Sequence, residues 1–254
     1  MNSQIWLLDP RPNLPSITDA VRHRFELSEA SNTPVMLMVR IRSCPVHGAF
    51  EAKDNVPPPL TVKEALSNPQ RRTDRIVLPP YSYIHEQEKV TERLPNALAY
   101  IREHGLNEVF GPKQGKIGIA LQGGMYNGVI RALQRLGLAD LHGESDIPLY
   151  VMNVGYPIVE EEFLAFCEGK ESVLVVEEGA PDYIEQALRA ALHKAGKSTQ
   201  LMGKGPFPMA GELTGRVMFE GIEGFLREVA PEMLRAQNRA PNEPQEGQEI
   251  PDLS

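Results

Sequence analysis

Apolar residues recur along the second half of the chain in a pattern of short continuous runs followed by spaced positions. The stretch from Lys116 to Gly137, KIGIALQGGMYNGVIRALQRLG, shows this pattern most clearly. Its first apolar run has strand length, and the glycine pair allows a tight turn. The later apolar residues then recur at helical spacing until Gly137. We therefore predict a strand, a tight turn and a helix.

The same alternation continues to about residue 228. It predicts further strands at 149–154, 172–179 and 199–202, and helices at 160–167, 182–196 and 214–226. Strands that alternate with helices in this way form a parallel sheet with helices on both faces. The predicted fold class is therefore α/β, with a small doubly wound parallel-sheet domain over residues 116–228.

The first fifty residues have a different pattern. Three prolines make residues 1–15 an irregular lead-in, and a helix is predicted from its cap, Ser16, to about Ala30. The apolar run from Val35 to Ile41 is typical of a buried parallel strand. One strand and one helix cannot close a sheet, so covering strands must come from further along this chain or from another polypeptide.

Residues 43–83 are rich in proline and charge, with one weak helical patch near 62–66. We interpret this segment as a long linker over a surface, more readily a flexible connector than a binding loop. A helix follows at 86–104, and Pro95 is expected to kink it. The predicted division is 1–50, a linker at 51–115, a domain at 116–228 and a disordered tail at 229–254.

Composition narrows the classes of function. Among 254 residues, 41% are hydrophobic and 24% charged, and the formal net charge of -8 argues against binding nucleic acid. Two cysteines, Cys44 and Cys167, are too few for a disulfide framework or for an iron-sulfur cluster built by this chain alone, which needs about four thiolates. No apolar run approaches the roughly 20 residues of a membrane span. We expect a cytoplasmic protein.

The glycine turn is the first candidate site. Gly123, Gly124 and Gly128 give the spacing G-G-x-x-x-G, which differs from the G-x-G-x-x-G pattern of dinucleotide-binding turns. We therefore favour a packing turn over a phosphate-binding loop. Gly123, Gly124 and the neighbouring Tyr126 remain weak candidates for an interface or a ligand contact.

An acidic pair is the second candidate. Glu177 and Glu178 lie at the carboxyl end of a predicted parallel strand, where α/β sheets place residues that face ligands. No second carboxylate or histidine accompanies them at a defined spacing. We therefore favour solvated acids or a subunit contact over acid-base chemistry.

Cys44 and His47 lie close together in the irregular segment RSCPVHG. A cysteine-histidine nucleophile needs an orienting third group, which this segment does not offer, so we assign it no role. The six histidines show no pair at metal-ligand spacing, and we predict no metal site and no catalytic residue in this chain.

Five segments together resemble one known family. They are RHRFELSEASNTPVMLMVRIRSC, KIGIALQGGMYNG, LYVMNVGYPI, SVLVVEEG and FPMAGELT, in this order over residues 16–228. The first resembles the end of the pyrimidine-binding domain of 2-oxoacid:ferredoxin oxidoreductases, and the others resemble their transketolase C-terminal-like domain. Within that family the likeness is to the indolepyruvate ferredoxin oxidoreductases.

The resemblance implies a function for the complete enzyme. Such enzymes use thiamine diphosphate and magnesium to decarboxylate an aryl 2-oxoacid, transfer the acyl group to coenzyme A and pass electrons through 4Fe-4S clusters to ferredoxin. The glutamate that activates the cofactor would precede Met1, and the diphosphate domain and cluster cysteines would follow the C-terminus or lie on another chain. Where the family carries a histidine after Arg42, this chain has Pro45, with His47 two residues later.

Three hypotheses follow from these patterns. The first is a fragment or subunit of an indolepyruvate:ferredoxin oxidoreductase that is inactive alone and binds none of these cofactors by itself. The second is a non-catalytic assembly module that holds an oligomer together through the incomplete N-terminal region. The third, the least favoured, is a nucleotide-binding protein that uses residues 123–128.

Overall fold

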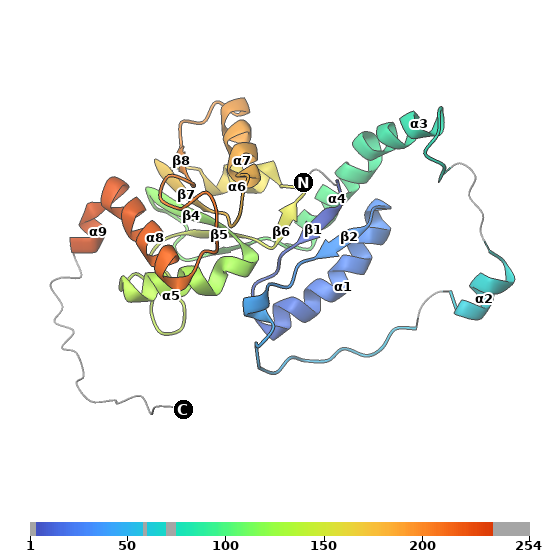
Figure 1. Ribbon diagram of the computed structural model, residues 1–254, viewed down its shortest axis with the longest axis horizontal. Coiled ribbons are helices and arrows are strands. Elements are labelled where there is room, and N and C mark those ends of the chain that lie inside the picture. The colour runs from blue at the N-terminus through green and yellow to red at the C-terminus, as the bar shows by residue number, and fades with distance from the viewer. Residues whose placement is uncertain (1–3, 58–59, 70–74, 236–254) are drawn as a thin grey trace.

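The computed structural model describes residues 4–57, 60–69 and 75–235, and its strands form two sheets (Figure 1). The main sheet contains β3 (Glu108–Phe110), β4 (Ile117–Gln122), β5 (Leu149–Met152), β7 (Ser172–Val176) and β8 (Gln200–Met202). The N-terminal sheet contains β1 (Trp6–Leu8), β2 (Val35–Leu37) and β6 (Val154–Tyr156).

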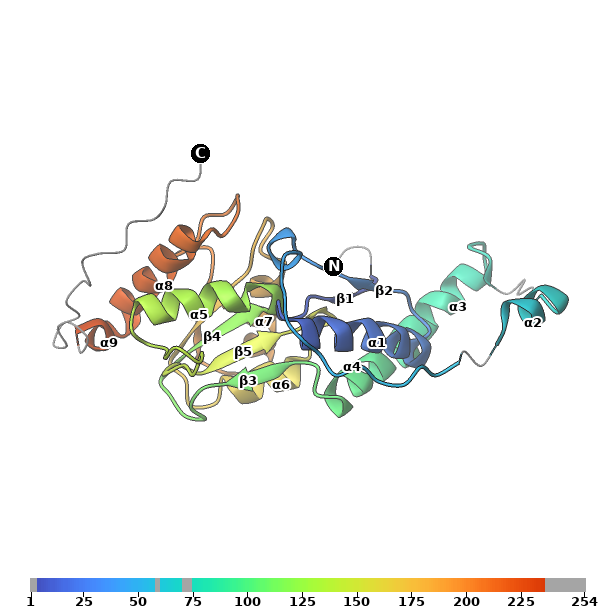
Figure 2. The same cartoon turned by 90° about the horizontal axis from the view of Figure 1, so that it is seen from below.

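The main sheet has the order β3-β5-β4-β7-β8. Four of its strands are parallel, whereas β3 pairs antiparallel with β5. One face is covered by α5 (Tyr126–Arg135) and α8 (Gly215–Val229), and the other by α6 (Glu160–Phe166) and α7 (Tyr183–Lys194) (Figure 2). The predicted doubly wound parallel sheet is confirmed, with one additional antiparallel edge strand.

A strand replaces the predicted irregular lead-in at the N-terminus. Residues Trp6–Leu8 form β1, which pairs parallel with β2 and antiparallel with β6. Trp6 is fully buried, and its indole Nε1 donates a hydrogen bond to Ser31 Oγ at 2.8 Å. The prediction for this segment was wrong because three apolar residues, followed by the spaced prolines at 10, 12 and 15, are too short a pattern to identify a strand.

The second predicted strand of the domain divides between the two sheets. Strand β5 ends at Met152, and after Asn153 the chain enters β6 of the N-terminal sheet. The sequence left two sources for the strands that pair with the N-terminal fragment, a later part of this chain or another polypeptide. Strand β6 shows that a later part of this chain supplies one of them.

Strand β2 lies at the edge of the N-terminal sheet, paired with β1 alone among the described residues. Its parallel direction is confirmed, but the predicted strand at 35–41 is shorter and is not buried. Met36 is 51% exposed and Ile41, beyond the strand, is 88% exposed. The apolar run therefore marks an uncovered edge and not a central strand.

Two helices pack on the N-terminal sheet. Helix α1 (Leu14–Ser31) and helix α4 (Leu94–Glu103) place Leu27 and Ile101, both fully buried, in a core shared with β1 and β6. The cap of α1 is Asn13, whose Oδ1 accepts a hydrogen bond from the Ser16 amide at 2.9 Å. Ser16, the predicted cap, lies inside the first turn.

The predicted helix at 86–104 consists of three pieces. Helix α3 (Tyr81–Glu88) passes through a π turn at residues 89–93 into α4. Pro95 lies in the first turn of α4, where a backbone N–H has no intrahelical partner and its loss costs little. The interruption therefore precedes the proline and takes the form of a π turn.

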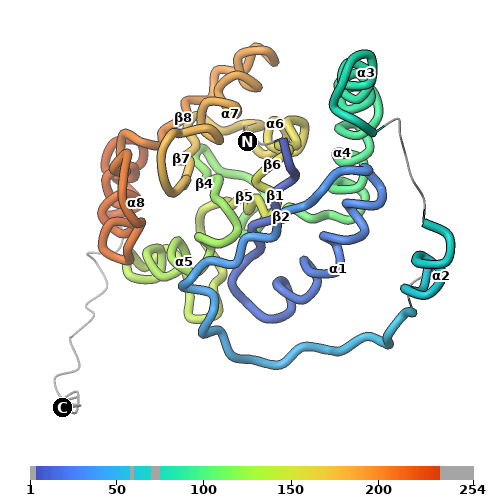
Figure 3. The backbone as a smooth tube through the Cα atoms, turned by 45° about the vertical axis from the view of Figure 1, so that its right-hand side comes forward, coloured from blue at the N-terminus to red at the C-terminus, as the bar shows by residue number. Residues whose placement is uncertain are grey.

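Residues 44–57, which follow the 3-10 turn at Ile41–Ser43, run along the outside of the molecule past α1, and α2 (Val62–Ser67) lies beyond them (Figure 3). The linker at 51–115 stays a prediction. Near the other end, α9 (Pro231–Arg235) forms within the range predicted as disordered, and the remaining tail prediction lies outside the described residues. Among the described residues no helix is both long and apolar enough to cross a membrane.

Candidate functional site

The carboxyl ends of β4 and β7 form the point where an α/β sheet usually receives a ligand. These strands are neighbours, and the chain leaves β4 for α5 on one face and β7 for α7 on the other. Loops that diverge in this way leave a crevice between them. In this chain the crevice receives two N-terminal segments, around residue 9 and residue 40.

The glycine pair of the turn is required by those segments. A Cβ atom on Gly123 would collide with the carbonyl oxygen of Asp9, and one on Gly124 would collide with Nε of Arg40 and lie 2.5 Å from Asp9 Oδ1. The space above the turn, where a phosphate group would lie in a nucleotide site, is therefore filled by the chain's own carboxylate and guanidinium groups.

Three charged side chains meet in this crevice, and we call them the Asp9–Arg40–Glu178 cluster. Arg40 donates to Asp9 Oδ2 through Nη2 at 2.7 Å and to Glu178 Oε2 through Nη1 at 2.5 Å. The Asp9 side chain is 1% exposed, and those of Arg40 and Glu178 are also largely buried. Charge-assisted hydrogen bonds of this kind are among the stronger ones in proteins.

Burial dominates the electrostatics of Asp9. It raises the pKa of the carboxyl above its ordinary value, although the hydrogen bond from Arg40 and the nearby Gly124 amide favour the charged form. The negative charge of Glu178 adds to the rise. A further anion in the crevice would meet the Asp9 and Glu178 carboxylates, which are already paired with guanidinium groups of this chain.

Glu178 holds four parts of the chain together. Its Oε1 accepts hydrogen bonds from Arg42 Nη2 at 2.5 Å and from the Leu213 amide at 2.9 Å, and its own amide donates to Gln122 Oε1 at 3.0 Å. The carboxylate thus connects β7, the N-terminal segment and the loop before α8. Both of its oxygens bind groups of this chain, which places the side chain in a structural contact.

Glu177 points to the other face of the sheet and caps α7. Its carboxylate accepts hydrogen bonds from the amides of Ile184 and Glu185, each at 3.0 Å. Burial raises the pKa of Glu177, while these amide donors act in the opposite direction. Asp182, which was expected to open this helix, makes no side-chain capping bond. The two adjacent glutamates therefore serve different contacts.

Tyr126 belongs to a second contact between the N-terminal segment and the main sheet. The guanidinium carbon of Arg11 lies 5.1 Å from the centre of the Tyr126 ring and 4.8 Å from that of Phe110. Arg11 also donates to Glu108 through Nε at 2.6 Å. Burial raises the pKa of the Tyr126 hydroxyl. The tyrosine thus packs where residues of the N-terminal segment approach β3.

The cysteine-histidine turn shows no catalytic arrangement. The exposed Cys44 thiol donates to the Arg40 carbonyl at 3.6 Å, and within the described part of the chain it makes no hydrogen bond to His47. In residues 4–57, 60–69 and 75–235 no group of three or more His, Cys, Asp or Glu side chains is placed to hold a metal ion.

Asp9 and Arg40 are the contacts that sequence reasoning missed. Their sequence context contains a signal, because each is a charged residue directly beside an apolar run, WLL for Asp9 and VMLMV for Arg40. A charge that the fold buries beside such a run requires a partner. The partners are 31 and 138 residues from Arg40, so the pairing itself becomes visible only in the fold.

Comparison with known proteins finds a family model that matches the region of the main sheet. Residues 107–230, from just before β3 to the end of α8, match the indolepyruvate oxidoreductase domain. The resemblance to indolepyruvate oxidoreductases is confirmed. Indolepyruvate oxidoreductase subunit IorA of Methanothermobacter marburgensis is 29% identical over 86% of this chain, and that of Pyrococcus abyssi is 26% identical over 88%.

The chain spans about a third of the length of these IorA relatives, 34% and 33% respectively. Among solved structures, 2-oxoglutarate:ferredoxin oxidoreductase from Magnetococcus marinus has a TM-score of 0.40 and 18% identity, covering 57% of this chain and 23% of that one. The matched indolepyruvate oxidoreductase domain includes the glycine turn and both glutamates, whereas Asp9 and Arg40 lie outside it.

The glycine turn does not fit the diphosphate group of thiamine diphosphate, the cofactor that the family resemblance implies for the complete enzyme. The Asp9 carboxylate and the Arg40 guanidinium fill the space above Gly123 and Gly124, and Glu178 adds a second negative charge. A diphosphate placed there would lie beside the carboxylates of Asp9 and Glu178, and like charges repel strongly in a buried site. The indolepyruvate oxidoreductase domain in this chain therefore uses its crevice to hold its own N-terminal segment.

Proposed function

We propose that this chain is a fragment or subunit of an indolepyruvate:ferredoxin oxidoreductase and is inactive alone. The complete enzyme would oxidatively decarboxylate an aryl 2-oxoacid to the acyl-CoA and reduce ferredoxin. One observation carries the proposal: residues 107–230 match the indolepyruvate oxidoreductase domain, yet the ligand edge of the main sheet is filled by the Asp9–Arg40–Glu178 cluster.

The partners follow from what the described residues lack. Among them no cysteine group is placed to hold a 4Fe-4S cluster, and the glycine turn does not fit a diphosphate, so we assign thiamine diphosphate, magnesium and the clusters to the remaining domains or subunits. We expect an oligomeric complex with ferredoxin as electron acceptor. A reducing cytoplasm suits the two free cysteines.

An activity assay tests the proposal. The purified 254-residue chain is mixed with indolepyruvate, thiamine diphosphate, Mg²⁺, coenzyme A and oxidised methyl viologen under anaerobic conditions. We expect no viologen reduction, because the glycine turn is filled by the Asp9–Arg40–Glu178 cluster and the chain spans about a third of the length of its IorA relatives. Substrate-dependent reduction by the chain alone would overturn the proposal.

An assembly module without a part in the reaction is the second candidate, and the uncovered N-terminal sheet favours it. Strand β2 has one free edge among the described residues, and Phe25 on α1 is 60% exposed. Uncovered strand edges and apolar faces are frequent sites of subunit contact. The two candidates separate in the assembled complex, whose turnover is lost without this chain under the first and retained under the second.

A further inference from the structure

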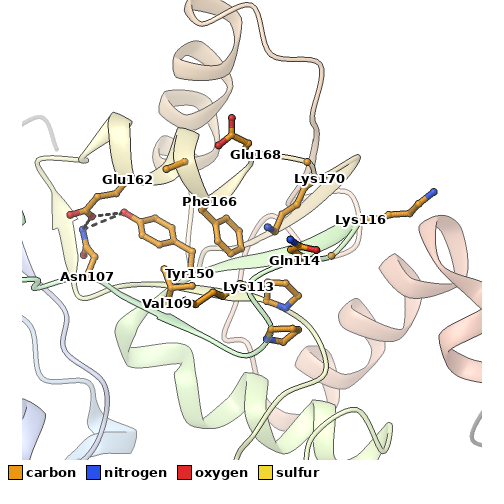
Figure 4. Close-up of a pocket in the computed structure, with 15 residues that line it drawn as sticks. Asn107, Val109, Lys113, Gln114, Lys116, Tyr150, Glu162, Phe166, Glu168 and Lys170 are labelled. Carbon is orange, nitrogen blue, oxygen red and sulfur yellow. Dashed lines mark hydrogen bonds between the residues drawn. The ribbon is translucent and has the colours of Figure 1, made fainter.

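The edge of the main sheet opposite to the crevice contains a cavity of about 940 Å³ (Figure 4). It lies between the β3–β5 edge, helix α6 and the segments that precede β4 and β7. Its volume is in the range of sites that hold small organic molecules, roughly 300–1,000 Å³. Nothing in the proposed function uses this region.

Lys170 brings a buried positive charge to the cavity. The residue is 7% exposed, and its Nζ lies 4.5 Å from the centre of the Phe166 ring. Among the described residues its ammonium group forms no hydrogen bond and no ion pair. Figure 4 shows this group directed among the lining residues. An ammonium group that has no anionic partner and lines a largely apolar cavity is well placed to pair with a carboxylate of a ligand.

The fold fixes the position of this lysine. Gly118 lies in the middle of buried β4, and a Cβ there would approach the Phe166 Cζ to 2.8 Å and the Lys170 Cδ to 3.0 Å. The glycine thus leaves room for both side chains against the sheet. Lys116, by contrast, has an 81% exposed side chain, pairs with Glu171 at 3.0 Å and points away from the cavity.

The other end of the cavity offers hydrogen-bond acceptors. Glu162 Oε2 accepts from the Tyr150 hydroxyl at 3.0 Å and from Asn107 Nδ2 at 2.8 Å. Between this carboxylate and Lys170 the lining is apolar, with Phe166 and Pro148 as its rings. The cavity therefore has a cationic end, an apolar wall and an end that accepts hydrogen bonds.

We propose that this cavity binds a small organic carboxylate with a flat apolar body. The carboxylate pairs with the Lys170 ammonium group, the body packs against Phe166 and Pro148, and a hydrogen-bond donor on the body faces Glu162. The site is separate from the Asp9–Arg40–Glu178 crevice, and its existence does not depend on the proposed oxidoreductase function.

Calorimetry with the full 254-residue chain tests this site with three probes. Indole-3-acetate has the carboxylate, the flat ring and an N–H donor, tryptophol replaces the carboxylate by a hydroxyl, and 1-naphthaleneacetate lacks the donor. We expect indole-3-acetate to bind at one site, tryptophol about tenfold more weakly or worse, and 1-naphthaleneacetate several-fold more weakly.

Two variants separate the proposed site from general surface charge. Lys170→Met should weaken indole-3-acetate binding about tenfold or more, whereas the matched control Lys116→Met should leave it unchanged. Because Lys170→Met removes no hydrogen bond or ion pair of the described residues, the unliganded variant should unfold at about the same temperature as the parent. Absence of indole-3-acetate binding, or equal binding by a folded Lys170→Met variant, would overturn the proposal.

Discussion

The two sheets of this chain differ in how completely they are covered. Every residue of β4 and β7 is buried, and the main sheet has helices on both faces. The N-terminal sheet has strands of three residues, and β2 leaves an uncovered edge beside exposed apolar side chains. The difference teaches that the main sheet is stabilised by two large apolar cores, one on each face, whereas the N-terminal sheet has one smaller core and also depends on its contacts with the main sheet.

Those contacts include a polar cluster. Strand β6 and the Asp9–Arg40–Glu178 cluster connect the N-terminal sheet to the main sheet. Breaking one partner of a buried charge pair leaves the other charge uncompensated, which costs more than the pair contributes to stability. Substitutions at the cluster should therefore affect the N-terminal sheet first.

The largest effect is expected for Arg40→Met, because it leaves Asp9 and Glu178 buried without their shared cation. The expected cost is about 3–5 kcal/mol. Limited proteolysis should show earlier cleavage before residue 50, while the main sheet resists. Arg216→Met, which breaks an exposed pair with Glu220, is the control and should change neither measurement. Equal protection of the N-terminal region in both variants would contradict the role given to the cluster.

Gly123→Ala should come next. Its Cβ would displace the Asp9 carbonyl from the turn, and such overpacking costs about 1–3 kcal/mol. Urea unfolding monitored by Trp6 fluorescence reports the loss in the N-terminal sheet. Gly224→Ala on α8 meets no atom within 4 Å and should be neutral or stabilising by up to about 1 kcal/mol. A neutral Gly123→Ala would mean that the turn does not hold the N-terminal segment.

Glu177→Ala should destabilise helix α7 on the main sheet and leave the N-terminal sheet unchanged. It removes the carboxylate that caps α7, and loss of a helix cap costs about 0.5–2 kcal/mol. Hydrogen exchange should accelerate at the amides of residues 184 and 185, with proteolysis of the N-terminal region unchanged. If proteolysis of the N-terminal region became faster instead, the assignment of Glu177 and Glu178 to different contacts would be wrong.

The smallest effect concerns pH. Burial raises the folded-state pKa of Asp9 above its unfolded value, so the folded chain binds this proton more tightly. Its contribution to stability is full below the unfolded pKa and is lost as pH rises through the folded pKa. Unfolding free energies of the parent and Asp9→Asn, measured between pH 3.5 and 7, should differ in slope by at most about 1.4 kcal/mol per pH unit, with the parent gaining on acidification. The opposite sign would show that Arg40 dominates over burial.

The main sheet could be predicted from the sequence because its strands are continuous apolar runs, whereas its helices have apolar residues at helical spacing. Strands β1, β3 and β6 were missed as separate strands, since three residues carry too little periodicity and their pairing depends on distant segments. The run at 35–41 was read as buried because hydrophobicity alone does not distinguish a central strand from an uncovered edge.

The candidate site was predicted in part. Its glycine pair and acidic pair stood out by their place at strand ends, but their partners did not. Arg40 lies 138 residues before Glu178. The carboxylate of Glu177 accepts a hydrogen bond from the amide of Ile184, seven residues later, at the start of α7. Whether a polar residue at a strand end faces a ligand or its own chain depends on these tertiary contacts, which no local pattern encodes.

The central claim is that this chain acts as part of a larger oxidoreductase. The most direct test is to purify the tagged full chain from its native cell and to measure polypeptides, iron and thiamine diphosphate in the product. The account predicts a larger polypeptide, with iron and thiamine diphosphate in the complex, and indolepyruvate oxidation that the separated chain lacks. Recovery of this chain alone, carrying thiamine diphosphate and oxidising indolepyruvate, would contradict it.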